Sequence, residues 1–129
     1  LPAWLQEVIS SYVSVLNACD YSYANHWKNA AHLINDAERA SEIEAALATR
    51  SPEAAFKGTE LALLRYAEKL TITPGLMEEG DVSALREEGL DDGQILEANQ
   101  IICYFNYVNR SLNGLGVTTA GDIVGFYSE

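Results

Sequence analysis

Apolar residues recur at steps of three and four through most of this chain, and this spacing constrains the fold more than any other feature. The clearest stretch lies at the start, where one face of a helix collects Leu5, Val8, Ile9, Tyr12, Val13 and Leu16. No segment of useful length alternates apolar and polar residues as a half-buried strand does. The spacing therefore predicts an all-α protein.

Signals for helix ends predict about six helices in a single-domain helical bundle over residues 1–129. Asp36 is placed to cap one helix, Gly89 to end another, and Asp91 with Gln94 has the form of a capping box. A turn or short helix is expected to start at 51–53, and a loop is expected at 73–75. The helices are expected from about Pro2 to Asn17, Cys19 or Asp20 to Ile34, Asp36 to Thr49, Thr59 to Leu70, Glu78 to Glu88, and Asp91 to Asn113, with Gly114 and Gly116 ending the last.

The two ends of the chain carry weaker signals. The sequence begins without methionine and enters a helical pattern at once, so we expect a natural N-terminal segment before Leu1. From Val117 onward no pattern is visible, and we expect either a mobile arm or a contact with another subunit.

Charge and cysteine content restrict the partners. A net charge of −11 repels nucleic-acid phosphates and anionic lipid, so neither nucleic acid nor membrane is an expected partner. No apolar run approaches the ~20 residues of a membrane span, and no signal-peptide pattern opens the chain. With only two cysteines, we expect a cytoplasmic protein with reduced thiols.

One helix face carries residues suited to chemistry. Cys19, Ser22 and His26 are spaced three and four apart, so one side of the second helix presents all three. Cys19 falls at the helix N-terminus, where free N–H groups favour a thiolate. His26 can reach the Ser22 hydroxyl, which is the layout of an activated nucleophile.

Glu7 completes this candidate site from the preceding helix. If the first two helices are antiparallel and joined near 17–18, Glu7 and His26 lie at matching heights. A carboxylate there can hold the imidazole tautomer or relay a proton. Each residue alone has an ordinary explanation: Cys19 as small core residue, His26 as structural histidine, Glu7 as surface charge. Their combined spacing favours function.

A polar stripe runs along the last helix, at steps of four and three through Asn99, Cys103, Asn106, Arg110 and Asn113. Buried amides need partners, so we expect the stripe to face other polar groups. It is expected to line the pocket, cap neighbouring helix ends or meet another subunit. Arg110 can also bind an anionic substrate group. Tyr23, beside Ser22, is a further candidate for the pocket or interface.

Neither a metal nor a cofactor is expected. His32 lies six residues after His26, which is not a same-face spacing, so a two-histidine metal site is not predicted. The sequence also contains no glycine-rich phosphate loop, zinc pattern or serine-hydrolase elbow.

The stretch from Leu16 to His26 resembles the signature of the alkylhydroperoxidase D-like proteins, in the carboxymuconolactone decarboxylase superfamily. That signature is a glutamate, then Cys-x-x-Cys, then a histidine four residues later. Glu7 falls twelve residues before Cys19, and His26 falls four after Ser22. Segments 63–71, 84–90 and 104–110 resemble the peroxidase-related branch, and the similarity covers nearly everything from Leu5 to Val117.

The resemblance implies an all-α homo-oligomer, a trimer or hexamer, that acts as an antioxidant oxidoreductase. It implies reduction of hydroperoxides by a cysteine pair that a dithiol reductant recycles, with no cofactor. In that scheme the second cysteine position attacks peroxide, the first resolves, and the histidine and glutamate relay the proton.

The sequence departs from the signature at its second cysteine position, where it has Ser22. A serine hydroxyl is a poor peroxide nucleophile and forms no disulfide. Ser22 is either an engineered replacement or the mark of a natural member whose redox chemistry is lost or altered. A further alternative is that Cys19 works as the lone thiol and that Cys103 or a partner thiol resolves it. The alternatives are a non-redox decarboxylase-type lyase using Glu7 and His26, and a catalytically inactive oligomeric binding protein.

Overall fold

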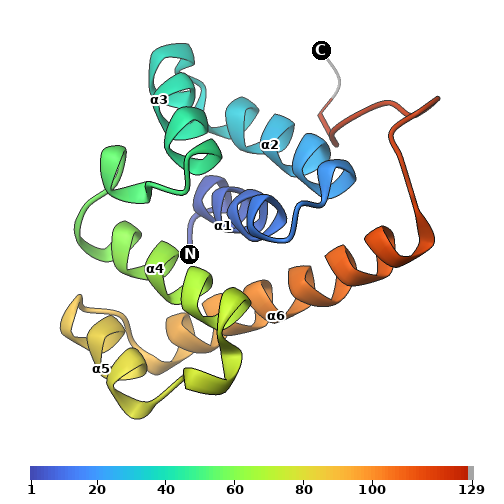
Figure 1. The fold of residues 1–129 in the computed structure, drawn as a ribbon. Helices are drawn as coiled ribbons and strands as arrows, with labels where there is room; N and C mark the ends of the chain where they lie inside the picture. Colours follow the sequence, from blue (N-terminus) through green and yellow to red (C-terminus); the bar gives the residue numbers. More distant parts are fainter. Residues whose placement is uncertain (128–129) are drawn as a thin grey trace.

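The structure, a computed structural model, describes residues 1–127, and its regular secondary structure is helical, with an irregular segment after the last helix (Figure 1). Two one-turn 3₁₀ helices, η1 (Pro52–Ala54) and η2 (Pro74–Leu76), accompany the α-helices, and no strand is present in this range. The α-helices are α1 (Ala3–Leu16), α2 (Asp20–Ile34), α3 (Ala37–Ala48), α4 (Gly58–Ile72), α5 (Glu79–Glu87) and α6 (Asp92–Leu115). The predicted all-α fold of about six helices is confirmed.

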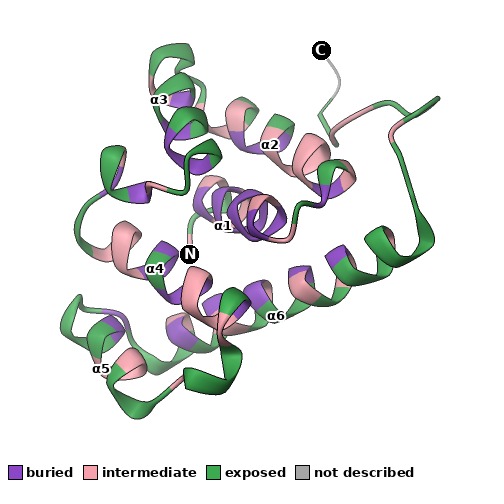
Figure 2. Cartoon of the chain, in the orientation of Figure 1, coloured by how far each residue is buried: buried purple, intermediate pink, exposed green. Residues whose placement is uncertain are grey.

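Helix α1 lies at the centre of the molecule, with α2, α4 and α6 around it (Figure 1). Its residues are buried on nearly every side, as Figure 2 shows in purple. The buried hydroxyls of Ser10, Ser11 and Ser14 each donate to the backbone carbonyl four residues earlier. These bonds satisfy the three hydroxyls within the helix, which lets a partly polar sequence occupy the core.

The predicted helix ends are present at three places. Asp36 accepts from the N–H of Arg39, and Asp91 and Gln94 form the reciprocal capping box. Gly89 has φ of +90° and follows α5, with its N–H on the carbonyl of Arg86 and the next N–H on Leu85. This pair of bonds is the Schellman arrangement, for which glycine is suited because it carries no Cβ.

A tight corner joins α1 and α2. Asn17 ends α1, Ala18 adopts a left-handed conformation with φ of +50°, and Cys19 is the N-cap of α2. The two helices then pack directly against each other, as the predicted antiparallel pair requires. The corner therefore fixes which residues of α1 face α2.

One expectation about the end of the last helix is wrong. Gly114 lies inside α6, which continues to Leu115 and ends at Gly116 with φ of +69°. A single glycine costs only about 1 kcal/mol in a helix, so Gly114 alone does not end it. Beyond 117 the chain folds back onto α2, where Gly125 and Phe126 donate backbone hydrogen bonds to Asn25 and Asn29.

Among residues 1–127, none of the helices has both the length and the apolar character that crossing a membrane requires.

Candidate functional site

Glu7 and His26 meet across the α1–α2 pair. Nδ1 of His26 lies 2.7 Å from Oε2 of Glu7, and the side chains are 16% and 20% exposed respectively. Because a carboxylate only accepts, Nδ1–H of the ring donates, and Nε2 is left to exchange a proton with another group. The expected contact between the two residues is present.

Asn29 supports this pair, and the sequence reasoning missed it. Its side chain is fully buried, and its Nδ2 lies 3.5 Å from Oε1 of Glu7, the oxygen that His26 does not use. The signal was available, because Asn29 continues the helical face of Ser22 and His26 at the next step of three. The resembling signature ends at the histidine and does not include this position.

Two aromatic rings border the imidazole. Phe105 of α6 is edge-on to His26 with 4.6 Å between ring centroids, and Phe126 is edge-on at 5.8 Å. They reach His26 from parts of the chain far away in sequence. The imidazole therefore has a polar partner on one ring nitrogen and apolar neighbours around it.

Cys19 and Ser22 lie on the same helix but in different surroundings from the pair. Cys19 is 1% exposed, is a free thiol, and occupies the N-cap of α2 as expected. The Ser22 hydroxyl is 2% exposed and shares a 2.8 Å hydrogen bond with the hydroxyl of Ser14. The expected Ser22–His26 bond is absent among the hydrogen bonds of residues 1–127, because each side chain is engaged with α1 instead.

The amides of the α6 stripe hold helices together. Asn99 donates to the Tyr66 hydroxyl, Asn106 donates to the Thr71 hydroxyl, and Asn113 donates to the carbonyl of Asn17. The stripe thereby ties α6 to α4 and to the corner between α1 and α2. Asn109, which the stripe pattern did not include, is fully buried, accepts from Asn17 and donates to Ser14.

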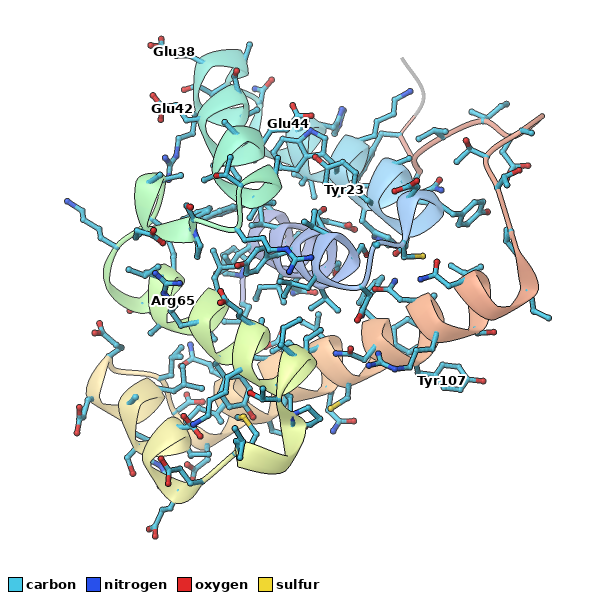
Figure 3. The ribbon with its side chains drawn as sticks, viewed as in Figure 1. Tyr23, Glu38, Glu42, Glu44, Arg65 and Tyr107 are labelled. Atoms are coloured by element: carbon cyan, nitrogen blue, oxygen red, sulfur yellow. The ribbon has the colours of Figure 1, made fainter. Side chains whose placement is uncertain are left out.

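Cys103 and Arg110 bond to amides of the same stripe but, within residues 1–127, to no other helix, and both are exposed. Together with Asn106 they line a pocket of about 290 Å³ between the end of α4 and α6, which is completed by Leu70, Thr71, Pro74 and Tyr107. The Arg110 guanidinium donates to Oδ1 of Asn106 at 2.7 Å, and Cys103 is a free thiol. Figure 3 shows Tyr107 projecting outward from α6.

Tyr23 faces α3. Burial, followed by the nearby charge of Glu44, raises the pKa of Tyr23 to about 12, so its hydroxyl stays protonated at neutral pH. Figure 3 shows Tyr23 on α2 and Glu44 on α3. The ring of Tyr23 also stacks with Trp27 at 6.4 Å between centroids.

No group of three potential metal ligands among His, Cys, Asp and Glu occurs in the described part of the chain. His32 instead stacks on Tyr127, with 4.2 Å between ring centroids.

The chain is an all-α protein whose first two helices hold a carboxylate against an imidazole. Two solved structures share its fold. An uncharacterized peroxidase-related protein from Silicibacter sp. TM1040 superposes with a TM-score of 0.82 at 24% identity, covering 92% of this chain and 60% of that one. The alkylhydroperoxidase AhpD core of an uncharacterized peroxidase-related protein from Ralstonia eutropha JMP134 gives 0.77 at 24% identity, covering 88% and 58%.

The chain therefore has the alkylhydroperoxidase D-like fold of peroxidase-related proteins, as the resemblance in its sequence implied. It spans about 60% of the length of these two structures. No protein-family model and no curated protein matches the sequence.

Proposed function

We propose that this chain is a thiol-dependent hydroperoxidase-like antioxidant protein, in which Cys19 supplies the thiol and the Glu7–His26 pair moves the proton. The observation that carries the proposal is the 2.7 Å contact between Glu7 and His26, on the helix that Cys19 caps. A carboxylate-oriented imidazole is a general acid–base group, and a helix N-terminus stabilises a thiolate.

The proposed chemistry begins with attack of the Cys19 thiolate on an oxygen of a hydroperoxide. The O–O bond breaks, the leaving alkoxide takes a proton from His26, and Cys19 becomes a sulfenic acid. One thiol of a dithiol reductant displaces water from that sulfur. Its second thiol then releases Cys19 and closes the reductant's own disulfide. Each cycle converts one hydroperoxide and one dithiol into an alcohol, water and a disulfide.

Ser22 makes this activity slow. It occupies the position of the attacking cysteine in the resembling signature, and a hydroxyl forms no disulfide with Cys19. Cys19 is also almost completely buried, so a peroxide reaches it only after local opening. Cys103 faces the pocket beside Leu70 and Thr71 of α4 instead, so the reductant is the proposed resolving thiol.

The test measures consumption of tert-butyl hydroperoxide with dithiothreitol, above the rate without protein. The wild type is expected to be slow, Cys19→Ala inactive, and Cys103→Ala unchanged as the matched control. Ser22→Cys is expected to be faster by roughly tenfold or more, because a neighbouring thiol reacts at high effective concentration. His26→Asn in that background is expected to lose at least about a hundredfold.

Two results would contradict the proposal. One is a wild type and a correctly folded Ser22→Cys variant that both leave the peroxide at the protein-free rate, which would favour a catalytically inactive binding protein. The other is wild-type turnover that Cys19→Ala leaves intact.

A non-redox lyase of the decarboxylase type is the second candidate. The observation that favours it is that the Glu7–His26 pair is complete without a thiol, while Cys19 is buried like a packing residue. In this case His26 and Glu7 act as acid and base on a small carboxylated substrate. Release of CO₂ from 4-carboxymuconolactone that survives Cys19→Ala but not His26→Asn would select it.

Assembly as a homo-oligomer, a trimer or hexamer, belongs to the same proposal. The outer side of α6 exposes large apolar side chains, at Leu96, Tyr104, Tyr107 and Leu115. Such a face is typical of a surface that another subunit covers. Sedimentation velocity gives the oligomer size, and a monomer at micromolar concentration would contradict this part. Two free cysteines suit a reducing compartment, and we propose the cytoplasm.

A further inference from the structure

Asn29 uses both ends of its side-chain amide, in opposite directions. Its Nδ2 points to Oε1 of Glu7 at 3.5 Å, and its Oδ1 accepts from the backbone N–H of Phe126 at 2.7 Å. The residue is fully buried on α2, one turn after His26. A single amide therefore joins the carboxylate of the pair to a segment 97 residues further along the chain.

The end of the chain fits closely against α2. We name residues 125–127 the C-terminal strap. Gly125 donates its N–H to Asn25 and has φ of +85°, where a Cβ would be strained and would lie 3.0 Å from Cδ of Lys28. Tyr127 stacks on His32 with the two rings 11° from parallel. Glycine is thus suited to position 125, because residues with a Cβ rarely adopt this φ.

The strap has a consequence for His26. Its Phe126 is held by the bond to Asn29, and the Phe126 ring stands edge-on to the imidazole at 5.8 Å. Glu7 occupies Nδ1 of that imidazole, so Nε2 is the ring nitrogen left to react. Release of the strap takes an apolar neighbour away from the imidazole and removes one partner from the Asn29 amide.

We propose that Asn29 is a positioning residue that couples the C-terminal strap to the Glu7–His26 pair. The amide that orients the carboxylate is the one that anchors Phe126 beside the imidazole, so access to His26 and the orientation of Glu7 change together. This inference rests on the proposed function for what the pair does, but the attachment of the strap is measurable without any substrate.

The test measures how fast diethyl pyrocarbonate acylates His26, read by peptide mass spectrometry, and how fast chymotrypsin cleaves after Tyr127, a residue that every variant keeps. Phe126→Pro removes the N–H that Asn29 binds and leaves α2 unchanged. Both rates are expected to rise by about twofold to tenfold, the factor that corresponds to one lost hydrogen bond. Asn29→Ala is expected to give the same increases.

Asn29→Asp provides the rescue variant. It keeps an acceptor for the Phe126 N–H, so chymotryptic cleavage is expected to return to the wild-type rate. Ile123→Ala is the matched control, because that side chain is almost fully exposed and lies just before the strap. Both rates are expected to be unchanged in this variant. Far-ultraviolet circular dichroism establishes whether each variant is folded. If Asn29→Ala does not fold, Phe126→Pro still provides the test.

Wild-type acylation and cleavage rates in folded Phe126→Pro would overturn the inference, as would rapid cleavage in Asn29→Asp. A second measurement is peroxide consumption in the Ser22→Cys background. If Asn29 positions the pair, Asn29→Ala is expected to lower kcat more than it changes KM. If no variant consumes peroxide, the proposed function fails while the acylation result still decides the strap.

Discussion

Replacing Tyr12 with phenylalanine removes one hydroxyl from the centre of the molecule. Tyr12 is fully buried on α1, and its hydroxyl donates to Oε2 of Glu68 on α4 at 2.7 Å. A hydrogen bond to a charged acceptor contributes about 1.5–3 kcal/mol, and the lower end applies here because the carboxylate is partly exposed. We therefore expect Tyr12→Phe to lower the free energy of unfolding at pH 7 by about 1.5 kcal/mol.

The same structure predicts that this cost disappears in alkali. Burial, followed by the hydrogen bond to Glu68 and its charge, raises the pKa of Tyr12 above the ordinary value of 10.0. A raised folded-state pKa means that the stabilisation is fully present below the unfolded value and is lost as pH rises above it. Each pH unit above about 10 removes about 1.4 kcal/mol from the wild type, because only the unfolded tyrosine ionises.

Phenylalanine has no such loss, so the two free energies of unfolding are expected to become equal about one pH unit above 10. Urea unfolding followed by circular dichroism at pH 7, 10 and 11 measures the difference. Tyr107→Phe is the matched control, because Tyr107 is exposed and its removal is expected to have little effect at any of these pH values. A Tyr12→Phe difference that stays constant from pH 7 to 11 would refute the reasoning.

Two further predictions concern other hydrogen bonds. Asn109→Ala removes a fully buried side chain that bonds to half-buried Asn17 and to buried Ser14, and we expect a loss of about 2–3 kcal/mol in urea unfolding; a loss under 0.5 kcal/mol would contradict this. The Lys69 ammonium and then the Glu78 N–H hold the pKa of Asp81 below its usual 3.8, so this stabilisation is present above that pH and lost as pH falls further. Asp81→Asn is therefore expected to make acid unfolding less steep below pH 4 than in the wild type, and equal slopes would count against the assignment.

The local parts of the fold could be predicted from sequence. Helix periodicity and the caps at Asp36, Gly89 and Asp91 act over a few residues, and the structure has each of them. The contact of Glu7 with His26 also followed, because it depends only on two helices and the short corner between them.

The rest depends on distant chain segments that carry no periodic signal. Phe126 reaches Asn29 after an irregular segment, and nothing in the spacing of residues 117–127 indicates that it folds back. The Ser22 hydroxyl was expected to bond to His26, but its partner is set by the packing of Ser14 and Asn109. Spacing along one helix tells which residues share a face, but not which neighbouring helix engages each of them.

The candidate site contains one contact between residues close in sequence and one between residues far apart in sequence. Glu7 and His26 are 19 residues apart, whereas Phe126 binds Asn29 across 97. Contacts between near residues close cheaply and early during folding, and those between distant residues close later. The acid–base pair is therefore expected to form with the first helical hairpin, and its aromatic surroundings to arrive only once the far end of the chain has docked.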